Sequence, residues 1–137
     1  MRTIFIDSLY LIALIMEDDQ WHSICQQTMQ SLGNNVRFVT TYEILTEFPA
    51  GVSRASPETR LKAVATVRDL TGSLNTKLIP PSIDLFNRGL ELYASRSDKR
   101  YSLTDCISMT VMRDFNVTEV LTHDRDFESE GFTRLIK

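Results

Sequence analysis

The sequence predicts an α/β domain, a three-layer α/β/α sandwich whose central sheet has about five, mostly parallel strands. Short apolar runs alternate along the chain with longer segments that have apolar residues at helical spacing. Strands joined through helices run parallel, and helices then cover both faces of the sheet. The 137 residues fit one domain, 1–137, and the scattered prolines and glycines mark no linker.

The N-terminal part of the chain is predicted to contain two strands, each followed by helix. Residues 3–6 and 36–40 are rich in β-branched and aromatic side chains, which is typical of buried strands. Pro49 and Gly51 predict a kink or break in the helix after the second strand, because proline lacks the amide hydrogen that a helix interior uses. The helical segments expected here are 9–16, 19–32 with Gly33 at its end, and a helix from Tyr42 that Thr41 can cap.

The C-terminal part continues the alternation. Ser56, Pro57 and Glu58 supply the cap, first-position proline and first-turn acid of a helix. The elements expected are this helix to residue 70, a strand at 77–79, a helix from Ser82 to Ser95, a polar loop at 98–100, a helix from Ser102, and strands at 119–122 and 133–136.

Composition excludes several classes of protein. With 42% hydrophobic and 24% charged residues, the chain can form a packed core and is not expected to be disordered. The net charge of −3 argues against a generic basic nucleic-acid binder, although the clustered carboxylates of a metal-dependent nuclease would themselves lower the charge. The apolar stretch 9–16 is far shorter than the ~20 residues that span a bilayer. Cys25 and Cys106 have no metal-binding spacing, so we expect a cytoplasmic protein with reduced thiols.

Four acidic residues from distant segments are expected at one edge of the sheet. Asp7 ends the first strand, Asp124 follows the fourth, and Glu47 lies on the helix after the second. Asp105 lies in the first turn of the helix before the fourth strand, so that turn can reach the same edge. Ligands of such sheets bind beyond the carboxyl ends of the strands, so the four carboxylates can form one site.

A divalent cation would relieve the repulsion between converged carboxylates. Mg²⁺ and Mn²⁺ prefer oxygen ligands, so acids without histidine or thiolate suit either ion. Each acid also has an ordinary structural explanation. Asp105 can complete a capping box with Ser102, Asp7 can cap a helix, Glu47 can lie on a solvated face, and Asp124 can bond its own turn. The joint pattern favours a metal site.

Other folds that bind phosphate or nucleotides fit less well. A haloacid-dehalogenase-type phosphatase needs Asp-x-Asp after the first strand, where Leu9 occupies the second acidic position. The acid pair, aspartate and later lysine of a phospho-receiver domain cannot be placed. The chain has no GxGxxG, so a Rossmann-type dinucleotide site is not supported.

Residues 100–132, RYSLTDCISMTVMRDFNVTEVLTHDRDFESEGF, resemble the C-terminal half of PIN-domain nucleases, especially VapC-type toxins. The segments TIFIDS at 3–8, VTTYEILTEF at 39–48 and DKRYS at 98–102 agree, so the resemblance spans the chain. It implies a parallel sheet, Mg²⁺ or Mn²⁺, cleavage of single-stranded RNA and a homodimer. For toxins it also implies a cognate antitoxin.

The resemblance also implies roles for individual residues. Because Pro49 can distort the helix that carries Glu47, Glu43 one turn earlier is the alternative for the second acid. His123 is expected to be a solvent-facing loop residue and not a catalytic base. The implied catalytic and metal-binding acids are Asp7, Glu47, Asp105 and Asp124, with Asp126, Asp98, Ser8, Ser102 and Thr122 as further residues near the site. The candidates for RNA contact are Arg54, Arg96, Lys99, Arg100 and Arg125.

We therefore expect a metal-dependent endoribonuclease that cleaves single-stranded RNA as the toxin of a toxin–antitoxin pair. Two alternatives stay open at this point. One is a PIN nuclease with a role in RNA processing, and the other is a non-catalytic PIN module that binds RNA or protein. The presence of all four acids disfavours a degenerate site.

Overall fold

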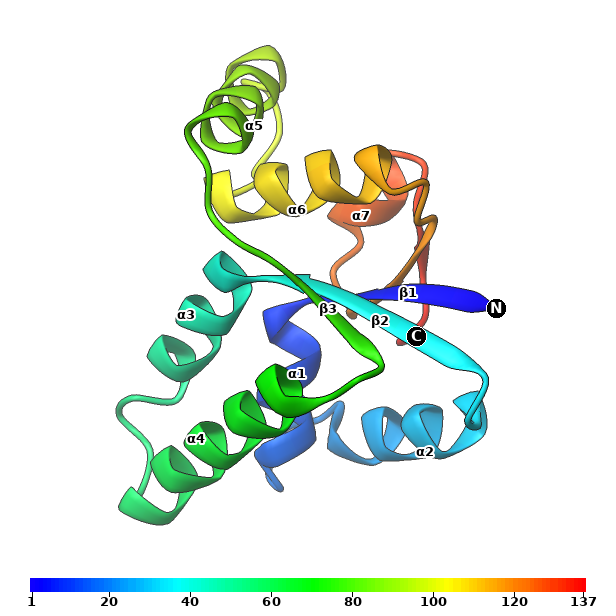
Figure 1. Ribbon diagram of the computed structural model, residues 1–137. Helices are drawn as coiled ribbons and strands as arrows, with labels where there is room; N and C mark the ends of the chain where they lie inside the picture. Colours follow the sequence, from blue (N-terminus) through cyan, green and yellow to red (C-terminus); the bar gives the residue numbers. More distant parts are fainter.

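All five predicted strands are present in the computed structural model, which describes residues 1–137, and they form one sheet (Figure 1). The strands are β1 (Arg2–Ile6), β2 (Val36–Thr41), β3 (Thr76–Ile79), β4 (Glu119–Leu121) and β5 (Thr133–Arg134). Their order in the sheet is β3-β2-β1-β4-β5, and every neighbouring pair is parallel. The predicted α/β/α architecture with a mostly parallel sheet is therefore confirmed.

Helices cover both faces of the sheet. They are α1 (Ser8–Ile15), α2 (His22–Leu32), α3 (Tyr42–Gly51), α4 (Pro57–Gly72), α5 (Ile83–Ser95), α6 (Leu103–Asp114) and α7 (Asp126–Ser129). In Figure 1, α6 and α7 lie on one side of the sheet, and α1, α2 and α4 lie on the other. Helix α5 packs mainly against α6 and stands away from the sheet (Figure 1). None of the helices has the length and apolar character needed to cross a membrane.

The core is centred on β1 and α6. Ile4, Phe5 and Ile6 are fully buried, as expected for a central parallel strand between two layers of helices. Helix α6 is buried from Cys106 to Met112 because it lies between the sheet and α5. Gly89 permits the close approach of α5, since an added Cβ would lie 2.6 Å from the Ile107 side chain and 3.4 Å from its backbone.

Two predictions about the N-terminal helices were wrong in detail. The segment predicted as helix from residue 19 becomes helical only at His22. The Asp19 carboxylate accepts a hydrogen bond from the Trp21 amide at 2.8 Å, and this side-chain bond favours a turn. Helix α3 continues through Pro49 to Gly51, where a kink or break was expected. Pro49 lies in the last turn, so few later residues depend on the hydrogen bond that it cannot make.

The C-terminal elements also differ from the predictions. The short helix α7 was not predicted, and it follows directly after the loop that carries Asp124. Strand β5 is shorter than the predicted strand at 133–136. The Leu135 and Ile136 amides nevertheless donate to carbonyls of Val120 and Thr122, so the chain continues alongside β4.

Candidate active site

The four acids predicted to converge line one pocket at the carboxyl edge of the sheet. Asp7, Glu47, Asp105 and Asp124 surround a cavity of about 380 Å³. Strands β1 and β4 deliver Asp7 and Asp124 because both run in the same direction and end side by side. Helices α3 and α6 supply the other two acids.

Asp7 is the most buried of these acids, with 2% of its surface exposed. It occupies the N-cap position of α1 without making a side-chain capping bond. Instead, its Oδ2 accepts a hydrogen bond of 2.7 Å from the Thr122 hydroxyl. Burial, and then the nearby charges of Asp105 and Glu47, raise the pKa of Asp7 to about 7, although the bond from Thr122 acts in the opposite direction. The site therefore disfavours a negative charge on Asp7 unless a cation compensates it.

Asp105 combines a structural and a site role. The Asp105 amide donates to the Ser102 hydroxyl and the Ser102 amide donates to Asp105 Oδ2, both at 3.0 Å, which completes the predicted capping box. The same carboxylate lines the pocket. Burial raises the pKa of Asp105 to about 6, and the charges of Asp124 and Glu47 add to this effect.

Glu47 reaches the pocket from α3, and the Ser8 hydroxyl at the start of α1 donates a hydrogen bond to its Oε1. Glu43, the alternative second acid, does not line this pocket. It lines a neighbouring pocket that also touches Glu47. The expected distortion by Pro49 does not turn Glu47 away from the other acids, because α3 remains helical up to Gly51.

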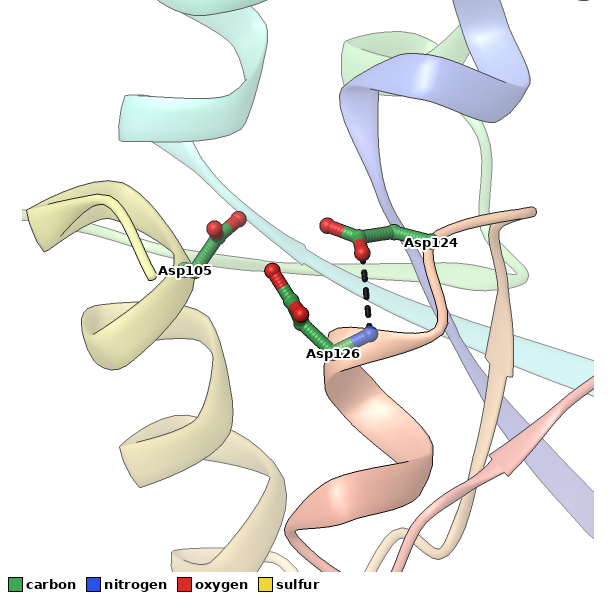
Figure 2. Close-up of side chains that lie close together, drawn as sticks. All are labelled: Asp105, Asp124 and Asp126. Carbon is green, nitrogen blue, oxygen red and sulfur yellow. Dashed lines mark hydrogen bonds between the residues drawn. The ribbon is translucent and has the colours of Figure 1, made fainter. Parts of the chain in front are cut away.

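Asp124 and Asp126 form a cluster with Asp105. Figure 2 shows the three carboxylates pointing toward one another, and one oxygen from each lies within 4.8 Å of the others. The Asp126 amide donates to Asp124 Oδ1 at 2.9 Å, and the Asp124 amide donates to the Thr122 hydroxyl at 3.1 Å. Asp124 is thus a turn residue and also a member of the acidic cluster. Asp126, at the start of α7, lies closer to the other acids than the sequence indicated.

The predicted hydroxyl residues hold the acids in place. Ser8 bonds Glu47, Ser102 bonds Asp105, and Thr122 connects the Asp7 carboxylate to the Asp124 backbone. Asp98, in contrast, is exposed in the loop before α6 and lines neither pocket next to Glu47. Sequence reasoning did not anticipate the apolar wall of the acidic pocket, which is formed by Leu9, Ile12, Ala50 and Gly51.

Some of the predicted RNA-contacting cations lie close to the cluster. Burial and the charge of Asp124 raise the pKa of Asp126, whereas the positive charges of Lys99 and Arg100 act to lower it. Both cations are exposed, as is Arg125 between the two clustered aspartates. Arg54 is also exposed, beyond the end of α3. Positive charge is therefore available beside an acidic site despite the net charge of −3.

Arg96, another residue predicted to contact RNA, pairs with Glu130. Arg96 Nε lies 2.9 Å from Glu130 Oε2, and Arg113 and the Tyr101 hydroxyl donate to the same carboxylate at 2.8 and 2.9 Å. Burial alone would raise the pKa of Glu130, but the three hydrogen bonds together lower it to about 2. Arg96 therefore joins the end of α5 to the segment after α7.

His123 is not the solvent-facing loop residue that was expected. It is half-buried, and its ring stacks on Trp21 with a centroid distance of 4.9 Å and an interplanar angle of 8°. Burial lowers the pKa of His123. Because Thr122 and Asp124 flank it, this stack holds the site loop against the segment before α2. No sequence signal joins these two positions, since they are far apart in the chain.

Comparison with known proteins identifies a family for this chain. A model of the PIN domain matches residues 4–132. The chain belongs to the PIN-domain family. This PIN domain is similar in structure to VapC20 of Mycobacterium tuberculosis, described as a sarcin-ricin loop cleaving toxin, with a TM-score of 0.83 and 23% sequence identity. The likeness covers 95% of this chain and 96% of VapC20. No curated protein matches the sequence significantly.

The acidic cluster of this PIN domain has the chemistry of a divalent-cation site. Its donors are carboxylate oxygens without thiolate or imidazole, which is the set that Mg²⁺ and Mn²⁺ prefer. Burial is the main cause of the raised pKa values of Asp7 and Asp105, and the charges of the neighbouring acids add to it. A bound cation would reverse that effect by favouring the ionised carboxylates.

Proposed function

We propose that this PIN domain is a metal-dependent endoribonuclease that cleaves phosphodiester bonds of single-stranded RNA. The observation that carries the proposal is the meeting of Asp7, Glu47, Asp105 and Asp124 in one pocket of a PIN fold. These acids hold Mg²⁺ or Mn²⁺. Asp126 is a further candidate ligand because its carboxylate belongs to the cluster with Asp105 and Asp124.

Each part of the site has a distinct task. The acids would hold a divalent metal, which would supply activation of a water molecule and neutralisation of charge on the phosphate. Thr122 keeps Asp7 and the Asp124 backbone in fixed relative positions, and the capping box fixes Asp105 at the start of α6. Lys99, Arg100 and Arg125 attract the RNA backbone beside the acids.

The cellular role proposed is that of a cytoplasmic toxin restrained by a cognate antitoxin protein. Its support is the structural similarity to VapC20, which is described as a toxin. A small gene for a DNA-binding-type protein beside this one would favour the toxin role. Co-expression supplies the functional test, because the neighbouring protein should restore growth of cells that make this nuclease. A lone gene whose product does not slow growth would favour RNA processing instead.

The proposed enzyme is a homodimer, and the exposed face of α5 supports this assembly. Ile83, Phe86, Leu90 and Tyr93 recur at helical spacing and remain exposed although they are large and apolar. Contiguous apolar patches on a monomer mark interaction surfaces. Sedimentation equilibrium should give a dimer for the wild-type protein and a monomer for a variant with Phe86→Asp and Leu90→Asp. A wild-type monomer at all concentrations would contradict the assembly.

The nuclease activity is tested with a labelled single-stranded RNA in the presence of Mg²⁺ or Mn²⁺. Cleavage should stop on addition of EDTA and fall by roughly 100-fold or more in Asp7→Asn and Asp105→Asn, since even residues outside the first ligand shell cost 10–100-fold. Glu58→Gln, which changes an exposed acid on α4, is the matched control. Unchanged cleavage in both aspartate variants would refute the site. Failure of Mn²⁺ to bind in calorimetry would favour a non-catalytic PIN module.

A further inference from the structure

A second pocket adjoins the acidic pocket. The two share Glu47 and Ala50, and the second has a volume of about 350 Å³, within the range of roughly 300–1,000 Å³ typical of ligand sites. Its other lining residues are Tyr42, Glu43, Thr46, Pro81 and Thr104. Thr104 directly precedes Asp105 on α6. A nucleotide with its phosphate at the acids can therefore place a neighbouring group in this pocket.

The lining of the second pocket suits a nucleobase and not a phosphate. It contains two glutamates and neither lysine nor arginine, so it repels phosphate groups. Tyr42 is 42% exposed and supplies an aromatic ring, and Pro81 adds an apolar side chain to the lining. Unpaired RNA bases stack on such aromatic side chains and are read through hydrogen bonds to their edges.

Glu43 supplies the group that can read a base edge. Its Oε1 is buried and has no hydrogen-bond partner in the protein. A buried acceptor without a donor is unfavourable, so this carboxylate gains from a donor supplied by a ligand. Glu43 lines the pocket, so a change of its side-chain rotamer would present the carboxylate to an occupant.

We propose that the second pocket binds a nucleobase beside the scissile phosphate and that Glu43 selects guanine there. This inference rests on the proposed nuclease function. Guanine presents two adjacent donors, N1–H and the N2 amino group, which match the two oxygens of one carboxylate. Uracil presents a single N–H between two carbonyl acceptors, which a carboxylate repels. The Tyr42 ring stacks on the base without choosing among bases.

Binding of neutral nucleosides tests the pocket separately from catalysis. Backbone amides of Tyr42, Glu43, Thr46 and Thr104 should shift in NMR titrations of the full chain with guanosine. Uridine should bind roughly tenfold more weakly, which corresponds to the loss of one good base contact. Glu43→Gln should remove this difference. Glu58→Gln, an acid at the equivalent position in the first turn of α4, should preserve it.

Tyr42 variants separate stacking from selection. Tyr42→Ala should weaken both nucleosides roughly tenfold, whereas Tyr42→Phe should retain their binding because the ring remains. The inference would be overturned if the amide signals of the pocket did not shift with guanosine, or if guanosine and uridine shifted them equally. A response to N-acetyl-arginine amide without a response to guanosine would also overturn it, and would indicate a pocket for an arginine of a protein partner.

Cleavage of a randomised single-stranded RNA pool, followed by sequencing, tests the same inference during catalysis. The wild-type enzyme should prefer guanine at one position beside the cut, and Glu43→Gln should cut without that preference. Asp105→Asn should cut no sequence. An unchanged preference in Glu43→Gln would refute base selection alone, whereas a wild-type protein that cuts no RNA would refute the nuclease function. The NMR titrations with nucleosides measure base binding without catalysis, so their result does not depend on whether the protein cleaves RNA.

Discussion

Replacement of Asp7 by asparagine is predicted to stabilise the metal-free protein at pH 8 while abolishing cleavage. The folded protein raises the pKa of Asp7 from its ordinary value of 3.8 to about 7, chiefly through burial. Between these pH values the folded state keeps a proton that the unfolded chain has released. The free energy of unfolding therefore falls as pH rises from about 4 to about 7, and then levels off.

The size of this effect follows from the two pKa values. Their difference, at about 1.36 kcal/mol per pKa unit, corresponds to about 4 kcal/mol at pH 8. Solvent screening reduces it little, because Asp7 is 2% exposed. Asparagine has the shape of the protonated acid and can still accept the hydrogen bond from Thr122. The variant should therefore exceed the wild type by only about 1 kcal/mol near pH 4.5, where the unfolded chain has begun to release the proton, and by up to about 4 kcal/mol at pH 8.

Urea unfolding in EDTA, from pH 4.5 to pH 8, measures this difference. Asp105, whose pKa is raised to about 6, contributes a change of the same sign that stays in the variant. Glu58→Gln should follow the wild-type curve. Parallel curves for Asp7→Asn and the wild type would refute the assignment of the pH dependence to Asp7. Saturating Mn²⁺ should stabilise the wild type more at pH 8 than at pH 5, because the ion binds the ionised acids.

Substitutions at three further positions test the contacts that support the fold around the site. Thr122→Val removes the donor to Asp7 and the acceptor for the Asp124 amide, so Mn²⁺ affinity measured by calorimetry should fall roughly 10–100-fold, with recovery in Thr122→Ser. Trp21→Ala removes the stack on His123 and should lower the free energy of unfolding in urea by about 2 kcal/mol, whereas Trp21→Phe should recover much of it. An equal loss in both Trp21 variants would contradict the stacking role. Because the pKa of Glu130 is lowered to about 2, its stabilising contribution is present above pH 4.5 and is lost as pH falls toward 2. Glu130→Gln should unfold more easily at pH 7 and lose less stability on acidification.

The sequence predicted best those features that depend on local patterns. The predicted strand ends located Asp7 and Asp124, and the predicted helix start at Ser102 located Asp105. In a parallel sheet these positions lie at the same edge, so the three acids were correctly expected in one pocket. Contacts between distant segments could not be predicted in the same way. The stack of Trp21 on His123 depends on how the segment before α2 packs against the loop after β4.

Charges were the hardest features to interpret from sequence. Arg96 and Lys99 lie in the same basic stretch, yet Arg96 pairs with Glu130 while Lys99 stays exposed near Asp126. Nothing in the local sequence distinguishes the two, because the partner of Arg96 lies after α7. The sequence indicated Asp126 only as a further residue near the site, and the reason is related. Its approach to Asp105 requires the short helix α7, whose pattern is too brief to predict.

The capping box of α6 has a practical consequence for the choice of an inactive protein. Asp105 completes the capping box in the first turn of α6, which forms much of the core, so its replacement removes an active-site acid and also weakens the start of this helix. Asp7 makes no capping bond, and its replacement leaves every helix start intact. Trapping an RNA or a protein partner on a folded but inactive chain should therefore begin with Asp7→Asn. A loss of binding in Asp105→Asn would not separate chemistry from folding.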